Sequence, residues 1–277
     1  SLEEHHPDTG TLFASWLSSE ANEASHVKRD TPVMVVLGNP PYSVSSSNKG
    51  EWIQTLIKDY KENLNEKKIN LDDDYIKFLR YGQFLIEKNG EGILAFISNN
   101  SFIDGVTHRQ MRKSLIESFD KIYIIDLHGS LKKKETDTEG GKDENVFDIQ
   151  QGVSINIFVK TGKKPKYSRN SVYHSDVFGT RAFKYERLFN SSIDLTQFQS
   201  INYSKPYHFF VSKDFSLQSE YDNFISIADL FIEIGSGVKT ERDRVCIHFS
   251  KKELIETINN FTDKSETDLR SLYKLGE

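Results

Sequence analysis

The segment that most constrains the fold is an apolar run that stops at two prolines. Val33–Leu37 is followed by Gly38 and then by Asn39–Tyr42, which reads Asn-Pro-Pro-Tyr. Five consecutive apolar residues favour a strand buried on both faces, as in a parallel sheet covered by helices. Each proline fixes its own φ and restricts the residue before it, so the strand ends in a rigid loop. Open α/β sheets bind ligands beyond this end of a strand, and we therefore expect the site at residues 39–42.

The residue types in this loop suit chemistry on an aromatic amine. Such an amine is a poor nucleophile because its lone pair is delocalised into the ring. Two acceptors on its N–H groups, the Asn39 side-chain oxygen and the Pro40 carbonyl, would favour a pyramidal nitrogen that can attack a methyl sulfonium. Pro40 and Pro41 aim these acceptors in advance, and Tyr42 offers a flat face for an extruded base. The alternative is an ordinary Asn-Pro turn with an aromatic residue packed beneath it.

The elements after this loop alternate between helix and strand. Asp72 or Asp73 can cap a helix with apolar residues at near-helical spacing, and residues 89–92 turn the chain into a strand at Ile93–Ile97. A helix over Gln110–Phe119 then leads into a strand over Ile122–Leu127. This order predicts an α/β fold, a partial Rossmann-like sheet that is doubly wound. Another helix is expected at Leu12–Lys28, and residues 43–50 are expected to form a mobile Ser/Asn-rich loop.

Five segments resemble, in order, the motifs of the amino-methyltransferases. They are Val35–Ser43 (motif IV), Asp74–Arg80 (motif V), Gly92–Phe102 (motif VI), Met111–Gly129 (motif VII) and Asn145–Ile155 (motif VIII). Their order is that of the gamma class of DNA adenine-N6 methyltransferases. The phrases Asp-Leu-His-Gly and Val-Phe-Asp-Ile are most similar to the methylase part of single-chain Type ISP and Type IIG restriction-modification enzymes. The resemblance implies methyl transfer from S-adenosylmethionine to the exocyclic amine of adenine in double-stranded DNA.

The resemblance also implies roles for particular side chains. Asn39–Tyr42 would form the catalytic loop, with Asn39 also beside the cofactor. Tyr42 and Phe147 would hold an extruded base between their rings, and Phe78 would pack near the cofactor. Judged by position alone, Phe147 is equally a core residue at the start of a strand, and Phe78 is more simply a core residue.

One departure from the family concerns the cofactor. The family binds S-adenosylmethionine through a glycine-rich motif I and an acidic residue after the next strand, both upstream of motif IV. No Gly-x-Gly follows a strand before Asn39, and Asp8–Thr11 has no apolar strand ahead of it. We therefore expect a fragment that lacks the main cofactor motif and is inactive by itself. Further domains of the same polypeptide would complete it: the motif I half of the methyltransferase, with nuclease or helicase domains as candidates.

The chain is expected to divide at a basic linker, Thr161–Lys166, which contains a glycine and a proline. Residues 1–164 would be the C-terminal part of the methyltransferase catalytic domain, with motifs IV to VIII. Residues 165–277 would begin a mixed α+β target-recognition domain. Within it, Ile234–Asp243 lacks the spacing of a phosphate-binding loop but resembles a segment that follows the methylase core in these restriction enzymes.

Two short helices are expected near the end of the chain, at Lys251–Asn260 and Glu266–Lys274. The charged insertion Lys132–Glu144 is expected to form an exposed hairpin tip. Its lysines could meet DNA phosphates, although a solvated loop is the simpler interpretation. His128 ends a strand without a nucleophile beside it and is expected to be structural.

Composition narrows the class of protein. The single cysteine, Cys246, rules out an intrachain disulfide and favours a reducing compartment. No apolar stretch is long enough for a membrane span, and we expect a cytoplasmic protein. A formal net charge of -5 excludes a uniformly basic nucleic-acid binder, so DNA contacts would come from local patches. His5-His6 and Cys246 with His248 lack further ligands at metal spacing, and no metal site is expected.

Two other functions are left open by the sequence. The amino group could belong to an RNA base or to a protein glutamine, but the long tail beyond Lys166 favours nucleic acid, because a glutamine methyltransferase would normally have no sizeable recognition domain there. The chain could also be a non-catalytic DNA-binding fragment, since half of the cofactor site is missing.

Overall fold

The computed structural model describes residues 23, 26, 30–42, 46–66, 71–136, 140–162, 171–233, 235, 237 and 239–275. The helix expected over Leu12–Lys28 lies outside the described residues except for Glu23 and His26, both helical. Four other expected features also lie partly outside the described residues: the loop at residues 43–50, the insertion Lys132–Glu144, the linker Thr161–Lys166 and the segment Ile234–Asp243. Ser1–Asp214 and Phe215–Glu277 are two separate compact units.

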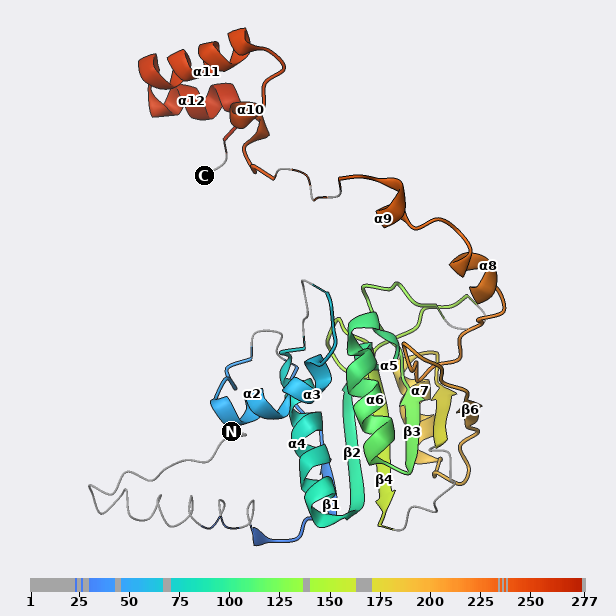
Figure 1. Ribbon diagram of the computed structural model, residues 1–277. Coiled ribbons are helices and arrows are strands. Elements are labelled where there is room, and N and C mark those ends of the chain that lie inside the picture. The colour runs from blue at the N-terminus through green and yellow to red at the C-terminus, as the bar shows by residue number, and fades with distance from the viewer. Residues whose placement is uncertain are drawn as a thin grey trace, which may run out of the picture. The chain divides into compact units, whose positions relative to one another are not determined.

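The first unit is built on one mixed sheet of six strands in the order β1-β2-β4-β3-β5-β6 (Figure 1). The strands are β1 Val35–Gly38, β2 Glu91–Asn99, β3 Lys121–Asp126, β4 Val153–Thr161, β5 Ser171–Asp176 and β6 Gln199–Ile201. β1 is parallel to β2, and β3 is parallel to β5, whereas β4 runs antiparallel between β2 and β3. The predicted α/β sheet is thus confirmed, with one reversed strand in its middle.

Helices cover both faces of this sheet. In the first unit they are α2 Glu51–Leu56, α3 Lys58–Lys61, α4 Asp74–Asn89, α5 Ser101–Asp104, the 3-10 helix η1 Val106–His108, α6 Arg109–Ser118 and α7 Arg181–Phe189. α4 ends at Gly90, whose φ of 88° is in the left-handed region that favours glycine. α4 and α6 confirm the two expected helices.

Two apolar clusters lie on opposite faces of the strands. The large one joins α4 and α6 to the face that carries Phe96, Ile124 and Phe158. The small one lies on the other face, where Ile97 and Ile155 meet Leu188 of α7. Adjacent residues of a strand point to opposite faces, which explains how Phe96 and Ile97 belong to different clusters.

The first strand is less buried than its composition predicts. Val35 and Leu37 are 59% and 79% exposed, while Val36 packs against the large cluster. β1 ends the strand order, and among the described residues it pairs only with β2. The expected burial on both faces is therefore wrong for β1, because its outer face has no covering element in the described part of the chain.

The division expected after residue 164 lies within the first compact unit. β5 continues the sheet by pairing in parallel with β3, and Tyr173 opposes Tyr123 with ring centroids 5.0 Å apart. β6 then pairs with β5. The breakers at Gly162 and Pro165 consequently separate two strands of one sheet, and the compact unit extends to Asp214. Assignment of the residues beyond 164 to target recognition stays a prediction.

The second unit consists, in its described residues, of helices without strands: α8 Gln218–Asp222, α9 Ile227–Leu230, α10 Asp243–Cys246, α11 Lys251–Asp263 and α12 Glu266–Tyr273. α11 and α12 confirm the two expected helices. Ser250 and Glu253 form a capping box at the start of α11, which explains where that helix begins. Among the described residues, no helix has the length and apolar character needed to cross a bilayer.

Candidate functional site

The strand directions bring distant segments to one edge of the sheet. β1, β2, β3 and β5 run the same way, so their carboxyl ends share an edge with the amino end of the reversed strand β4. Residues 39–42 follow β1 at this edge, and the loop from Asp143 to Gly152, here called the 143–152 loop, precedes β4. The Asn100 amide donates to the Gly152 carbonyl at 3.0 Å, which joins the end of β2 to this loop.

The Asn-Pro-Pro-Tyr loop has a defined arrangement of its side chains. Pro40 is buried, whereas Asn39 and Pro41 are exposed and Tyr42 is half-buried. The Tyr42 hydroxyl lies 3.1 Å from Asn39 Oδ1 and 3.3 Å from the carbonyl oxygen of Ile97, both of which can accept its proton. Asn39 Oδ1 has a second lone pair, so it can still accept a hydrogen bond from a bound amine.

The surroundings of Tyr42 keep its hydroxyl protonated. Partial burial, together with the negative charge of Asp73, raises the pKa of Tyr42 to about 12. Its ring meets the buried ring of Tyr75 edge-on, with centroids 6.5 Å apart and an interplanar angle of 77°. Tyr75 belongs to α4, so the motif V helix sets the position of the motif IV aromatic ring.

The described part of the segment after this loop is hydrogen-bonded to α4. Asp74 Oδ1 accepts hydrogen bonds from Ser46 Oγ at 2.5 Å and from Asn48 Nδ2 at 2.8 Å. Lys77, fully buried, donates to Ser46 Oγ at 2.9 Å and to the Asn48 carbonyl at 2.5 Å. Two charged residues of α4 thus bind Ser46 and Asn48, and the expected mobility of residues 43–50 stays a prediction. The Ser46 and Asn48 side chains were the sequence signal that this segment could form such hydrogen bonds.

Phe147 lies in the 143–152 loop and is half-buried. It packs, as Tyr42 does, against the small apolar cluster formed by Leu127, Val146, Val153 and Val177. Phe147 also lines a hollow of about 460 Å³, whose lining includes Asn145 and Arg181 but not Tyr42. The structure thus brings the two aromatic residues to one cluster, and a base held between their rings stays a prediction.

Phe78 is half-buried on α4 and packs against the large cluster. This position accords with the simpler interpretation of Phe78 as a core residue. Contact between Phe78 and a cofactor stays a prediction.

A network of charged residues lies at the carboxyl ends of β3 and β5. His128 Nε2 lies 2.8 Å from Asp176 Oδ1, and its ring stacks on Phe178 at 3.8 Å. Burial lowers the pKa of His128, but the Asp176, Glu135 and Asp126 carboxylates more than offset this and raise it to about 9.

The same network contains a possible set of metal ligands. Ligand-type atoms of Asp126, His174 and Asp176 lie within 4.8 Å of one another. However, Asp126 already accepts hydrogen bonds from Asn100 Nδ2 at 2.9 Å and from the His128 amide at 3.0 Å. Asp126 and Asp176 thus have hydrogen-bonding partners within the protein, and the structural role expected for His128 stays a prediction.

The charged insertion, in its described residues, has the strand pairing of a hairpin, but the expected exposure is wrong at Asp143, which is buried. Thr136 and Lys142 make an antiparallel bridge, and Lys132, Lys133 and Lys134 are exposed. Contact between these lysines and DNA phosphates stays a prediction.

Part of the chain is similar to known proteins. Residues 8–132 match the model of a family described as Eco57I restriction-modification methylase. No curated protein matches the chain. Among solved structures, the ATP-dependent Type ISP restriction-modification enzyme LlaBIII bound to DNA is similar at 27% identity and a TM-score of 0.68, over 92% of this chain and 18% of that one.

Two further structures are similar. A DrdV–DNA complex matches at 27% identity and a TM-score of 0.66, over 89% of this chain and 26% of that one. A nuclease-deletion mutant of the Type ISP enzyme LlaGI with a DNA substrate mimic shares the fold at 22% identity and a TM-score of 0.67, over 93% of this chain and 21% of that one. The chain thus spans 18–26% of the length of these proteins. The predicted resemblance to the methylase portion of such enzymes is confirmed: residues 8–132 match the model described as Eco57I restriction-modification methylase, and Type ISP restriction-modification enzymes are among the similar structures.

Proposed function

We propose that this chain is the target-base side of a DNA adenine-N6 methyltransferase within a larger restriction-modification enzyme. The observation that carries the proposal is the Asn-Pro-Pro-Tyr loop, which presents an exposed Asn39 amide and a half-buried Tyr42 ring at the carboxyl end of β1. The family match and the DNA complexes of similar enzymes support it.

In this proposal the loop prepares the amine for attack. Asn39 Oδ1 accepts one N–H of the adenine amine through its second lone pair, and the Pro40 carbonyl accepts the other. These two bonds favour a pyramidal nitrogen, which frees the lone pair that would otherwise be delocalised. Pro40 is buried and fixed in φ, so the acceptors need little reorganisation when the base arrives. S-adenosylmethionine, when bound, would supply the electrophilic methyl group.

The residues assigned to the cofactor fit it only in part. Asn39 is exposed at the strand end and could face a bound cofactor, whereas Phe78 packs into the core. The sequence before Asn39 has no glycine-rich motif I. We therefore propose that other segments of the full-length protein hold most of the cofactor, while this chain holds the base.

The proposal predicts that Asn39→Ala nearly abolishes methyl transfer in the full-length enzyme. Removing one preorganised hydrogen-bonding group costs about 2.7–4 kcal/mol of transition-state stabilisation, or roughly 10²–10³ in rate. Single-turnover transfer of labelled methyl groups to a target duplex would measure the loss, with DNA affinity measured in parallel.

Asn89→Ala is a matched control, because Asn89 lies at the opposite edge, where its Nδ2 donates to the Glu91 carbonyl at 2.7 Å. Nucleoside analysis of the product should show N6-methyladenine. Turnover by Asn39→Ala equal to that of the control would refute the role of Asn39, and methylated cytosine as the product would refute the adenine assignment.

A further inference from the structure

We propose that Arg181, the first residue of α7, is a positioning residue for Phe147. This inference rests on the proposed function, and it adds the β5–α7 segment to the base-holding side of the site. The segment lies beyond the motifs that suggested the function, and no sequence motif marks Arg181.

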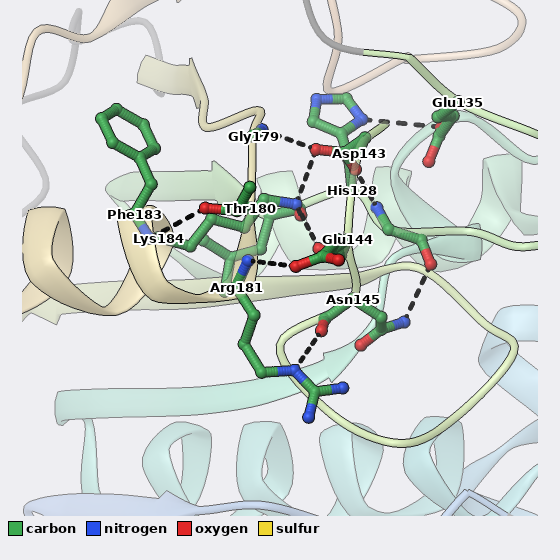
Figure 2. Close-up of polar contacts among 12 residues, drawn as sticks. His128, Glu135, Asp143, Glu144, Asn145, Gly179, Thr180, Arg181, Phe183 and Lys184 are labelled. Atoms are coloured by element: carbon green, nitrogen blue, oxygen red, sulfur yellow. Dashed lines mark hydrogen bonds and ion pairs between the residues drawn. The ribbon is translucent and has the colours of Figure 1, made fainter. Parts of the chain in front are cut away.

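Arg181 binds the backbone around Phe147 from several directions. Its Nε donates to the Asn145 carbonyl at 2.8 Å, and its Nη2 donates to the Phe147 carbonyl at 3.1 Å. Nη2 also lies 2.7 Å from Asp148 Oδ1, and the Arg181 amide donates to Glu144 Oε2 at 3.0 Å. Figure 2 shows the guanidinium extending from the start of α7 to Asn145. One side chain therefore binds the 145–146 peptide unit and the peptide unit that follows Phe147.

Asp143, the first residue of the 143–152 loop, is held separately by a buried ion pair. Lys184 Nζ lies 2.8 Å from Asp143 Oδ1, and both side chains are fully buried. Asp143 also accepts hydrogen bonds from the Gly129 amide at 2.7 Å and from the Gly179 amide at 2.8 Å (Figure 2). These contacts anchor Asp143 to the end of β3 and to α7, and they do not involve the rest of the loop.

Asn145, which lies between Asp143 and Phe147, links the start of the 143–152 loop to its end. Its Nδ2 donates to the Gly129 carbonyl at 3.0 Å and to the Gln151 carbonyl at 2.7 Å. Its Oδ1 accepts the Phe147 amide at 2.8 Å. With the Phe147 amide held by Asn145 and its carbonyl held by Arg181, the peptide groups on both sides of the ring have fixed directions.

The geometry assigns Arg181 to positioning and Lys184 to stability. The Lys184 ammonium is fully buried, whereas the Arg181 side chain is 38% exposed and lines the hollow beside Phe147. Loss of Arg181 should therefore free the loop tip while the ion pair keeps the unit folded. The planar fork of the guanidinium matters, because a lysine ammonium has no fork of fixed donors that could match these acceptors.

The test compares Arg181→Met and Arg181→Lys with Arg187→Met. Arg187 is an exposed arginine on the same helix and serves as the matched control. Amide hydrogen exchange in the 277-residue chain should rise for peptides covering residues 144–151 in both Arg181 variants and not in the control. In the full-length enzyme, both Arg181 variants should lose between roughly fivefold and a hundredfold in single-turnover rate, as expected when one stacking face is misplaced. Their KM for DNA should not change.

The outcomes separate this inference from the proposed function. Unchanged exchange in Arg181→Met would overturn the positioning role whatever the enzyme does. Full activity of Arg181→Lys beside an inactive Arg181→Met would also overturn it, because charge alone would then suffice, as in a phosphate contact. Arg181 variants with a raised KM for DNA and normal turnover would likewise overturn the positioning role. If the wild-type enzyme neither methylates DNA nor raises the fluorescence of 2-aminopurine at the target position, the proposed function fails, and the exchange result still decides the role of Arg181.

Discussion

Replacing Lys184 by methionine should destabilise the first unit by about 3–5 kcal/mol, the cost of removing one partner from a buried ion pair. Methionine has nearly the same length as lysine but no charge and no donor. The substitution would leave the fully buried Asp143 carboxylate without its cation, 2.8 Å away in the native chain. It would also leave the carbonyls of Leu127 and Glu144 without their donor, which lies at 2.7 and 2.6 Å.

The remaining contacts of Asp143 place the expected value in the lower half of that range. The carboxylate keeps two donors, the amides of Gly129 and Gly179. A second substitution, Asp143→Asn, removes the charge and still leaves an oxygen that can accept one of them. The double variant should therefore be more stable than Lys184→Met alone, because no unpaired charge remains buried. The difference gives a coupling energy in a double-mutant cycle.

The measurement is urea unfolding followed by tryptophan fluorescence. Trp52 lies on α2 of the first unit, and Phe215–Glu277 contains no tryptophan, so unfolding of the second unit does not contribute to the signal. Lys121→Met is the matched control, since this lysine is exposed at the start of β3 and a surface substitution usually changes stability by less than about 0.5 kcal/mol. A Lys184→Met variant as stable as this control would refute the argument.

Two further predictions concern the rings and the charged network. Tyr42→Phe should reduce methylation only mildly, because the ring is kept. Tyr42→Ala and Phe147→Ala should each weaken retention of the extruded base by about 1–3 kcal/mol, measured as lost 2-aminopurine fluorescence. A Tyr42→Phe variant as impaired as Tyr42→Ala would show that the hydroxyl matters more than the ring. The pKa of His128, raised from 6.5 to about 9, implies stabilisation that is fully present below pH 6.5 and is lost as the pH rises through 9. Asn tolerates the φ of 52° at this position, so His128→Asn should remove this pH dependence from the urea midpoints, and an unchanged dependence would exclude His128 as its source.

Local sequence signals predicted the local elements well. The strand expected at Ile93–Ile97 lies inside β2, and the helix expected at Gln110–Phe119 matches α6 to within one residue at each end. Gly90 marks the end of α4 as expected, because the left-handed φ there favours glycine. These features depend on neighbouring residues, and a single sequence carries that information.

Pairing between distant residues was not predicted. A glycine and a proline at Thr161–Lys166 have the composition of a domain linker, yet β5 pairs with β3 beyond them. The burial of Lys184 had no signal either, since lysine is usually exposed and its partner, Asp143, lies in a charged insertion. Arg181 had no signal either, since the acceptors that tie it to the backbone around Phe147 are carbonyls, which leave no trace in residue type.

The reversed strand explains why a loop far along the chain can belong to the site. In an all-parallel sheet, only segments that follow a strand reach the carboxyl edge. β4 runs antiparallel, so the 143–152 loop that precedes it arrives at that edge instead, beside the residues that follow β1 and β2. The contact is close: a Cβ added to Gly152 would lie 2.7 Å from Asn100 Nδ2, so a larger residue there would displace the Asn100 side chain at the end of β2. The loop that carries Phe147 then needs support from its other side, and β5 and α7 provide it through Arg181 and Lys184.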